Sequence, residues 1–151
     1  MNKDTVMIER WLTEINTLPG VETVFIASGR GSVLYNAGKL KLSSKELEDI
    51  ALRVLRIGAL FNEKDENVSE IELFWKNVFI ISKISNNILL TTICQNPKIL
   101  PLLRITLNVS LSHLLQEKKI IKQAKNHATD KTLVLRKGKF DEDELSLLSS
   151  I

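Results

Sequence analysis

The sequence of 151 residues has little of the chemistry that catalysis and metal binding require. It contains one cysteine, Cys94, two histidines, His113 and His127, and 5% aromatic residues. One thiol cannot form an intramolecular disulfide or complete a paired zinc or redox site. We find no Ser-His-Asp or Cys-His set and no G-x-x-x-x-G-K-[ST] motif. We therefore expect no metal, no cofactor and no enzymatic activity.

Long hydrophobic runs are also missing. No stretch reaches the roughly 20 apolar residues that cross a bilayer, and the N-terminus has no signal-peptide pattern. With the lone cysteine, this favours a cytoplasmic location. Apolar residues make up 44% of the chain, which is enough for one aliphatic core.

The net charge of +3 is unevenly distributed. Residues 1–117 carry 13 basic and 13 acidic side chains, whereas residues 118–151 carry eight and five. A neutral body argues against nucleic-acid binding, which depends on neutralising phosphates. We predict a domain over 1–122 and a C-terminal extension over 123–151 that is partly ordered or docks. Two interpretations of its charges stay open: a solvated surface, or a segment that meets an acidic partner or anionic lipid.

Three antiparallel strands are predicted between Ser69 and Cys94. Residues 69–75 alternate apolar and polar side chains, which is typical of a strand with one buried face. Residues 78–81 are continuously apolar and residues 88–94 are apolar and β-branched, as expected of strands covered on both faces. Lys76-Asn77 and residues 85–87 are the predicted turns. The first strand is therefore an expected sheet edge, and the other two are expected to be interior.

The elements before this meander are a helix from Asp4 to about Thr17 and a hairpin over 21–28 and 32–36. A second helix follows, with a capping box formed by Ser43 and Glu46, and runs to about Phe61. The last helix is predicted from about Leu100 to residue 122. It is apolar nearly all round in its first half, which predicts burial on two sides.

The second helix carries more apolar groups than one core uses. At 100° per residue, Leu52, Ala59 and Leu60 fall outside the core-facing side, and Arg53 and Arg56 share that outer side. In addition, Gly58, next to Ala59, would let the backbone of another chain approach closely. We expect a protein contact here, the alternative being ordinary scattered surface leucines.

The element order, with the segments GRGSVLYNAG and FIISKISNNILLTTICQNPKILPLLRITL, resembles the roadblock family of dynein light chains and MglB-like regulators. The resemblance covers about residues 6–116. It implies an α+β fold of order α-β-β-α-β-β-β-α. A five-stranded antiparallel sheet would have two helices on one face and one on the other, a layout shared with profilin-like and longin-like folds. Two departures are Ser28, where an acidic residue is common, and Pro101, where a glycine is common.

The resemblance also implies function. It implies a non-enzymatic scaffold or regulator that forms a homodimer, or pairs with a similar roadblock subunit, and binds a small Ras-like GTPase, sometimes stimulating hydrolysis. The implied dimer contact is the first meander strand and the second helix, here Leu52, Ala59, Leu60, Glu70, Ile71, Glu72, Leu73 and Trp75. The predicted GTPase contact uses Leu52, Arg53, Arg56 and Leu60, with Ala59 beside them. A sensory domain that binds a small ligand is the alternative.

The edge strand adds a constraint to this dimer. Its outer backbone groups have no predicted partner in the chain, and pairing with the same strand of a second copy would cover them. Glu70 and Glu72 would then have to avoid facing each other, or meet Lys76.

Overall fold

The computed structural model describes residues 3–38, 42–62, 68–75, 78–85, 87–95 and 97–126. Its elements are α1 (Lys3–Asn16), β1 (Val21–Ser28), β2 (Val33–Gly38), α2 (Ser44–Asn62), β3 (Glu70–Trp75), β4 (Val78–Ser85), β5 (Ile88–Cys94), the 3-10 turn η1 (Pro97–Ile99), α3 (Leu100–Leu114) and α4 (Lys118–Asn126). The predicted order is confirmed up to α3. The turn predicted at Lys76-Asn77 and the extension after residue 126 lie outside the described residues.

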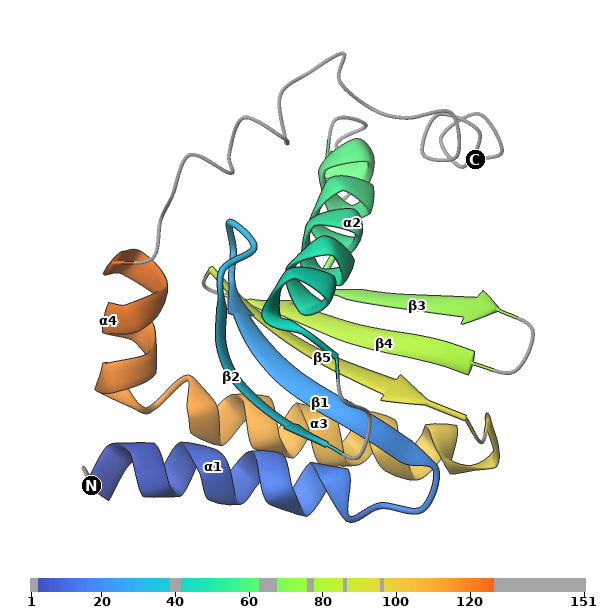
Figure 1. Ribbon diagram of the computed structural model, residues 1–151, viewed down its shortest axis with the longest axis horizontal. Helices are drawn as coiled ribbons and strands as arrows, with labels where there is room; N and C mark the ends of the chain where they lie inside the picture. The colour runs from blue at the N-terminus through green and yellow to red at the C-terminus, as the bar shows by residue number, and fades with distance from the viewer. Residues whose placement is uncertain are drawn as a thin grey trace.

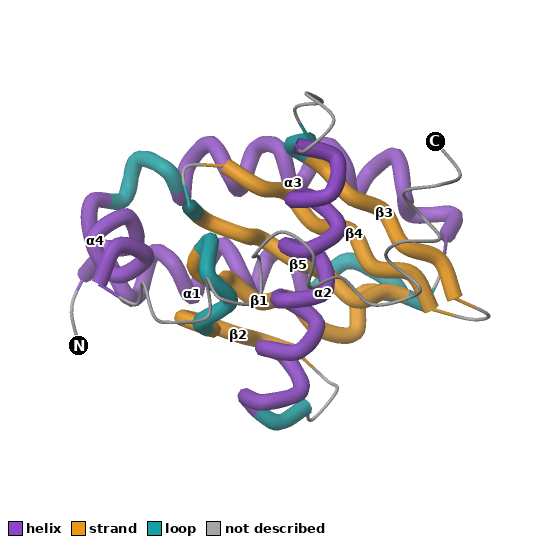
Figure 2. Tube along the Cα trace, turned by 90° about the horizontal axis from the view of Figure 1, so that it is seen from above, coloured by secondary structure: helices purple, strands orange, loops and turns teal. Residues whose placement is uncertain are grey.

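The five strands form one antiparallel sheet in the order β2-β1-β5-β4-β3. Helices α1 and α3 run under one face, and α2 lies on the other (Figure 1). Seen from above, α2 runs across the strands (Figure 2). The predicted fold class is therefore confirmed, as is the assignment of β3 to an edge and of β4 and β5 to the interior. The second edge is β2.

Each face of the sheet has its own aliphatic core. On the α1 and α3 side, Leu12, Ile15, Leu103 and Leu107 pack with Ile81 and other strand residues. On the α2 side, Leu47, Ala51 and Val54 pack on Phe25 and Leu89. Strand β5 serves both cores, since Leu89 and Leu90 point to opposite faces and both are fully buried. This explains why apolar residues follow one another in its sequence without the alternation of a one-sided strand.

Several local predictions are confirmed by hydrogen bonds. The capping box forms in both directions, because the backbone N–H of Glu46 donates to Ser43 Oγ and the N–H of Ser43 donates to Glu46 Oε1, each at 3.2 Å. Asn87 has a φ of 63°, the left-handed conformation expected in the β4–β5 turn. Ser28 Oγ accepts the N–H groups of Arg30 and Ser32, so this serine supports the β1–β2 turn where an acidic residue is common.

The predicted extent of the last helix is wrong. Helix α3 ends at Leu114, and the chain turns through residues 115–117 before α4. The N–H groups of Gln116 and Glu117 donate to the carbonyls of His113 and Leu114, three residues back, which tightens and ends the helix. The turn lets α4 insert Ile120 and Ala124 into the α1 and α3 core. The predicted end of the last helix, at residue 122, consequently falls inside α4.

The predicted burial of α3 on two sides is also wrong for the part of the chain that the structure describes. One side packs on the sheet through Leu103, Leu107 and Leu114. The opposite side leaves Leu102, Ile105 and Val109 about half exposed, at 50%, 63% and 48%. Helix α1 lies beside α3 rather than over this stripe, and the two helices meet where Trp11 stacks on His113, with ring centroids 4.5 Å apart.

Candidate functional site

The outer backbone of β3 is open in the single chain. The carbonyl of Ser69 accepts the N–H of Ile84 on β4 at 2.8 Å, so the backbone groups of Ser69 point inward. Successive residues of an antiparallel strand alternate in this direction. The N–H and C=O groups of Glu70, Glu72 and Phe74 therefore point away from β4, at the edge of the sheet. These groups are where another strand can pair.

Both acidic side chains of β3 are neutralised within the chain. Glu72 lies beside α3, where Arg104 Nε and Nη2 donate to its two carboxylate oxygens at 2.7 and 2.6 Å. Glu70 forms an ion pair with Lys83, the residue opposite it on β4, with Nζ and Oε1 2.5 Å apart. Lys76, the predicted partner, lies outside the described residues. Cations of the same subunit therefore offset both acidic charges at this edge.

The two-pronged contact with Arg104 lowers the pKa of Glu72. The hydrogen bonds from the guanidinium are the largest cause, and its positive charge adds to them, whereas partial burial opposes the shift. The pKa of Arg104 is raised by the same pair. Glu72 is therefore ionised throughout the neutral range, and its charge is offset by Arg104 at the edge.

Phe74 is the site residue that the sequence predictions missed. Its side chain is 61% exposed, and among the large exposed hydrophobic residues of the described chain it is the aromatic one. It lies on the α3 side of the sheet, since it stacks on Phe79 with ring centroids 5.8 Å apart. The signal was present in the alternation of β3, because Phe74 falls on the same face as Glu70 and Glu72, where a polar residue would be ordinary.

The other face of β3 packs under α2. Ile71 is buried in the α2 core and Leu73 packs against that core while half exposed, which confirms the predicted alternation. The side chain of Trp75 lies outside what the structure describes. Of the strand residues predicted to contact a second copy, Glu70, Glu72 and Leu73 therefore retain exposed surface, whereas Ile71 is mostly covered by its own subunit.

The predicted contact on α2 is only partly at the surface. Arg53 is exposed, and Leu52, Arg56 and Ala59 are half-buried. The placement of Leu60 outside the core-facing side was wrong, because this side chain is only 2% exposed. The covered arc of α2 is wider than one stripe, and includes Leu55 and Ile57 besides the predicted core positions.

Gly58 has a different role from the predicted one. A Cβ added there would lie 3.5 Å from Ile84 Cδ1 and 3.7 Å from Ile71 Cδ1, so this glycine faces the chain's own sheet rather than a second backbone. The contact nevertheless locates α2: its C-terminal half lies over β3 and β4. Ala59, the next residue, is thereby near the open edge.

The described residues show neither a metal site nor a reactive thiol. They contain no group of three or more His, Cys, Asp or Glu side chains that could hold a metal ion. Burial raises the pKa of the Cys94 thiol to about 11, which suits an inert core residue rather than a nucleophile. None of the described helices has the length and apolarity to cross a membrane.

No protein-family model matches this sequence, and a search of curated proteins finds no match. Solved structures do match. The Myxococcus xanthus protein MglB superposes with a TM-score of 0.68 at 17% identity, covering 82% of this chain and 94% of that one. The chain has the roadblock fold.

Two further matches agree with this assignment. The gliding protein MglB from Thermus thermophilus has a TM-score of 0.63 at 13% identity, covering 83% of this chain and 94% of that one. A Roadblock/LC7 domain from Streptomyces avermitilis has a TM-score of 0.56 at 10% identity, covering 71% and 97%. At such low identity, the likeness of this chain to other roadblock structures concerns the fold, and the site has to be argued from this chain's own residues.

Proposed function

We propose that this protein is a non-catalytic, dimeric scaffold or regulator that binds a small Ras-like GTPase. The observation that carries the dimer is the β3 edge, whose outward N–H and C=O groups are free while both of its acids are neutralised. The roadblock fold supports the functional class, through the resemblance to MglB-like regulators. A related solved structure bears the description "MglB with tetrameric arrangement", which favours self-association in proteins of this shape.

The dimer is formed by antiparallel pairing of β3 with β3 of a second copy, or of a similar roadblock subunit. In a two-fold pair, opposite residues lie on the same face. A register with Phe74 opposite Phe74 of the second copy places two exposed rings together, and aromatic cross-strand pairs are favourable. The same register keeps Glu72 from facing its own copy. We propose this register because it covers the most exposed aromatic side chain.

The GTPase contact uses the surface of α2 that Leu52, Arg53, Arg56 and Ala59 form. This surface is on the face of the sheet opposite α1 and α3 (Figure 1). Because the C-terminal half of α2 lies over β3 and β4, two copies joined at β3 would bring their α2 helices to one side of the extended sheet. A GTPase can then contact both copies.

Binding to purified Ras-like GTPases from the same organism, loaded with GDP or a GTP analogue, tests the proposal by calorimetry. We expect binding in at least one nucleotide state, and loss of about tenfold or more in affinity for Arg53→Glu. Arg10→Glu on α1 is the matched control, since Arg10 is exposed on the other face. Absence of binding in both states overturns the GTPase assignment, and a monomer in light scattering overturns the dimer.

The small-ligand alternative is less well supported by the packing. Both sides of the sheet are filled by aliphatic side chains. The buried hydroxyls of Ser82 and Thr91 bond to each other at 2.8 Å, rather than converging on a space for a ligand. We also propose a cytoplasmic location, on the grounds of the single buried cysteine.

A further inference from the structure

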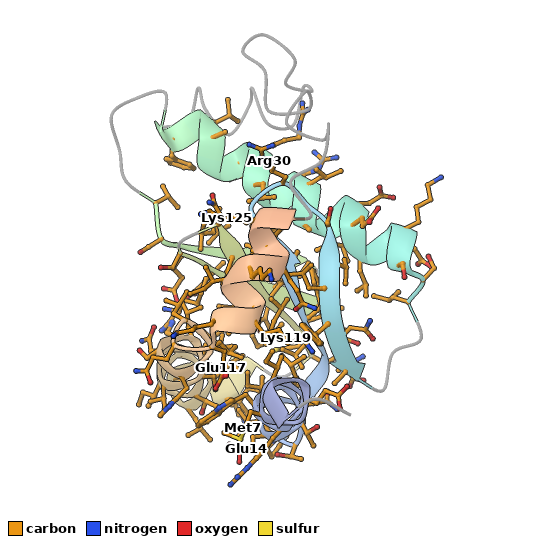
Figure 3. All side chains as sticks on the ribbon, turned by 90° about the vertical axis from the view of Figure 1, so that its left-hand side faces the viewer. Met7, Glu14, Arg30, Glu117, Lys119 and Lys125 are labelled. Carbon is orange, nitrogen blue, oxygen red and sulfur yellow. The ribbon has the colours of Figure 1, made fainter. Side chains whose placement is uncertain are left out.

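Helix α4 carries an exposed basic surface. Lys118, Lys122 and Lys125 lie on its outer side and are exposed, and no ion pair joins them to an acid of the described chain. Lys119 is half exposed. Figure 3 looks onto α4, with Lys119 and Lys125 labelled near its two ends. The nearest acid in the sequence is Glu117, at the start of the helix, where a negative charge is favourable.

The inner side of the same helix is fixed to the domain. Ile120 and Ala124 are buried in the α1 and α3 core. The hydroxyl of Tyr35 on β2 donates to Gln123 Oε1 at 2.6 Å. The lysines are thus presented on a rigid support at the β2 end of the sheet, the opposite edge from β3. A partner on α4 leaves both the proposed dimer edge and the α2 surface accessible.

The chain that follows adds to this charge. Residues 118–140 hold eight basic side chains and one acidic one, Asp130, a net charge of +7 in a protein whose first 117 residues are neutral. The basic residues after α4 flank an apolar run, Leu133, Val134 and Leu135, and Phe140 follows the last of them. The four acids at 141–144 come only afterwards. A local excess of this size attracts a polyanionic surface.

Two features favour a lipid surface over nucleic acid or an acidic protein. Ile121, between the lysines, is 36% exposed, and an apolar side chain among lysines suits the interface between lipid headgroups and acyl chains. The cations of α4 are all lysines, point charges suited to a diffuse negative field, whereas arginine is the usual choice for geometric recognition of single phosphates and carboxylates.

We propose that α4 is a peripheral binding surface for anionic lipid bilayers. The helix lies on the membrane with Lys118, Lys122 and Lys125 toward the headgroups and Ile121 at the boundary. We expect this binding to be reversible and mainly electrostatic, because it uses lysine charges and a single partly exposed apolar side chain. The proposal does not depend on the dimer or on the GTPase.

Flotation of the full-length protein with vesicles tests it, comparing pure phosphatidylcholine with a 70:30 mixture of phosphatidylcholine and phosphatidylserine. We expect binding to the mixture alone, and its loss in 0.5 M salt. The variant Lys118→Gln/Lys122→Gln/Lys125→Gln should lower the partition coefficient about 100-fold. Ile121→Asn should lower it several-fold and, unlike the lysine variant, leave the salt dependence unchanged.

The matched control is Arg10→Gln/Lys45→Gln/Lys98→Gln, which removes the same charge from exposed positions away from α4. It should bind the anionic vesicles within about threefold of the unmodified protein, and circular dichroism should show both triple variants folded. Equal loss in both triple variants, equal binding to neutral vesicles, or tighter binding to a 20-base-pair DNA duplex than to the vesicles would each overturn the proposal.

Discussion

The two edges of the sheet are built differently. Strand β2 is irregular, because its register with β1 shifts between Ile26 and Ala27, and α4 is tied to it through Tyr35 and Gln123. Bulges and covering elements are the usual means of blocking a sheet edge. Strand β3 pairs with β4 without a shift over its whole length, and an exposed phenylalanine lies on it.

The charges sharpen this contrast. Inward or unpaired charges on an edge strand protect it from association. Glu70 and Glu72 would serve that purpose on β3, but Lys83 and Arg104 offset both. The β2 edge is therefore blocked within the chain, whereas the β3 edge lacks such protection, in keeping with its proposed pairing with a second strand.

The largest expected effect comes from removing an outward hydrogen-bond donor of β3. Phe74→Pro deletes a backbone N–H that faces away from β4, and proline is tolerated at such edge positions. A two-fold pair would lose two hydrogen bonds, which weakens the dimer about 100-fold. Sedimentation velocity measures this change, and circular dichroism shows that the subunit remains folded.

In the same assay, Phe74→Ala distinguishes the contribution of the backbone hydrogen bonds from that of the aromatic ring. It keeps the N–H and removes the aromatic pair, so we expect a loss of only about tenfold or less. Equal dimerisation of the proline variant and the unmodified protein would show that β3 is not the contact. If Phe74→Pro unfolds the subunit, Glu72→Pro takes its place in the experiment, because the backbone N–H of Glu72 also points outward.

The next effect concerns Arg104. In Arg104→Ala, the carboxylate of Glu72 stays at the edge without its guanidinium. The proposed register keeps the two Glu72 side chains from facing each other, but both then carry an unneutralised charge on one face of the joined sheet, and such charges repel at low salt. We expect dimerisation about tenfold weaker at low salt and close to normal at high salt, because salt screens exposed charges. Glu72→Gln in the same variant should restore the dimer. Failure of this rescue, with a weakened dimer, would mean that Arg104 acts by packing instead.

Acid should remove the same ion pair. The pKa of Glu72 in the folded chain is lowered by Arg104, so the pair's stabilisation is fully present above the ordinary pKa of a glutamate and is lost as pH falls through the lowered value. The difference in unfolding free energy between the unmodified protein and Arg104→Ala should be constant from pH 7 to about pH 5 and shrink below that. Urea titrations along this pH series measure it, and a difference that grows with acid contradicts the assignment.

The fold was largely predictable because its signals are local. The capping box of α2, the alternation of β3 and the asparagine turn before β5 each depend on residues near one another in sequence, and each formed as predicted. The resemblance to the roadblock family supplied the arrangement of these elements. The break after Leu114 was missed because no proline or glycine marks it, and the gain comes from burying Ile120 in a distant core.

The site was less predictable because it depends on tertiary neighbours. A helical wheel assigned Leu60 to the surface, but this side chain is only 2% exposed, and a wheel contains no information on the tertiary neighbours that cover a residue. Likewise, Arg104 and Glu72 are 32 residues apart, and no local sequence pattern indicates that they pair. Phe74 could have been found, since an exposed aromatic side chain on the polar face of an edge strand is visible in the sequence.

The smallest expected effect is on the protected edge. Tyr35→Phe removes the hydroxyl that bonds to Gln123 and leaves a partly buried amide oxygen without that donor. We expect a loss of about 1 kcal/mol in unfolding free energy and no change in the dimer constant, because β3 is untouched. Gln123→Ala and the double variant complete a cycle that isolates the pairwise contribution. A coupling near zero would show that α4 holds to β2 through Ile120 and Ala124 alone, and a weakened dimer in Tyr35→Phe would mean that β2, rather than β3, pairs between subunits.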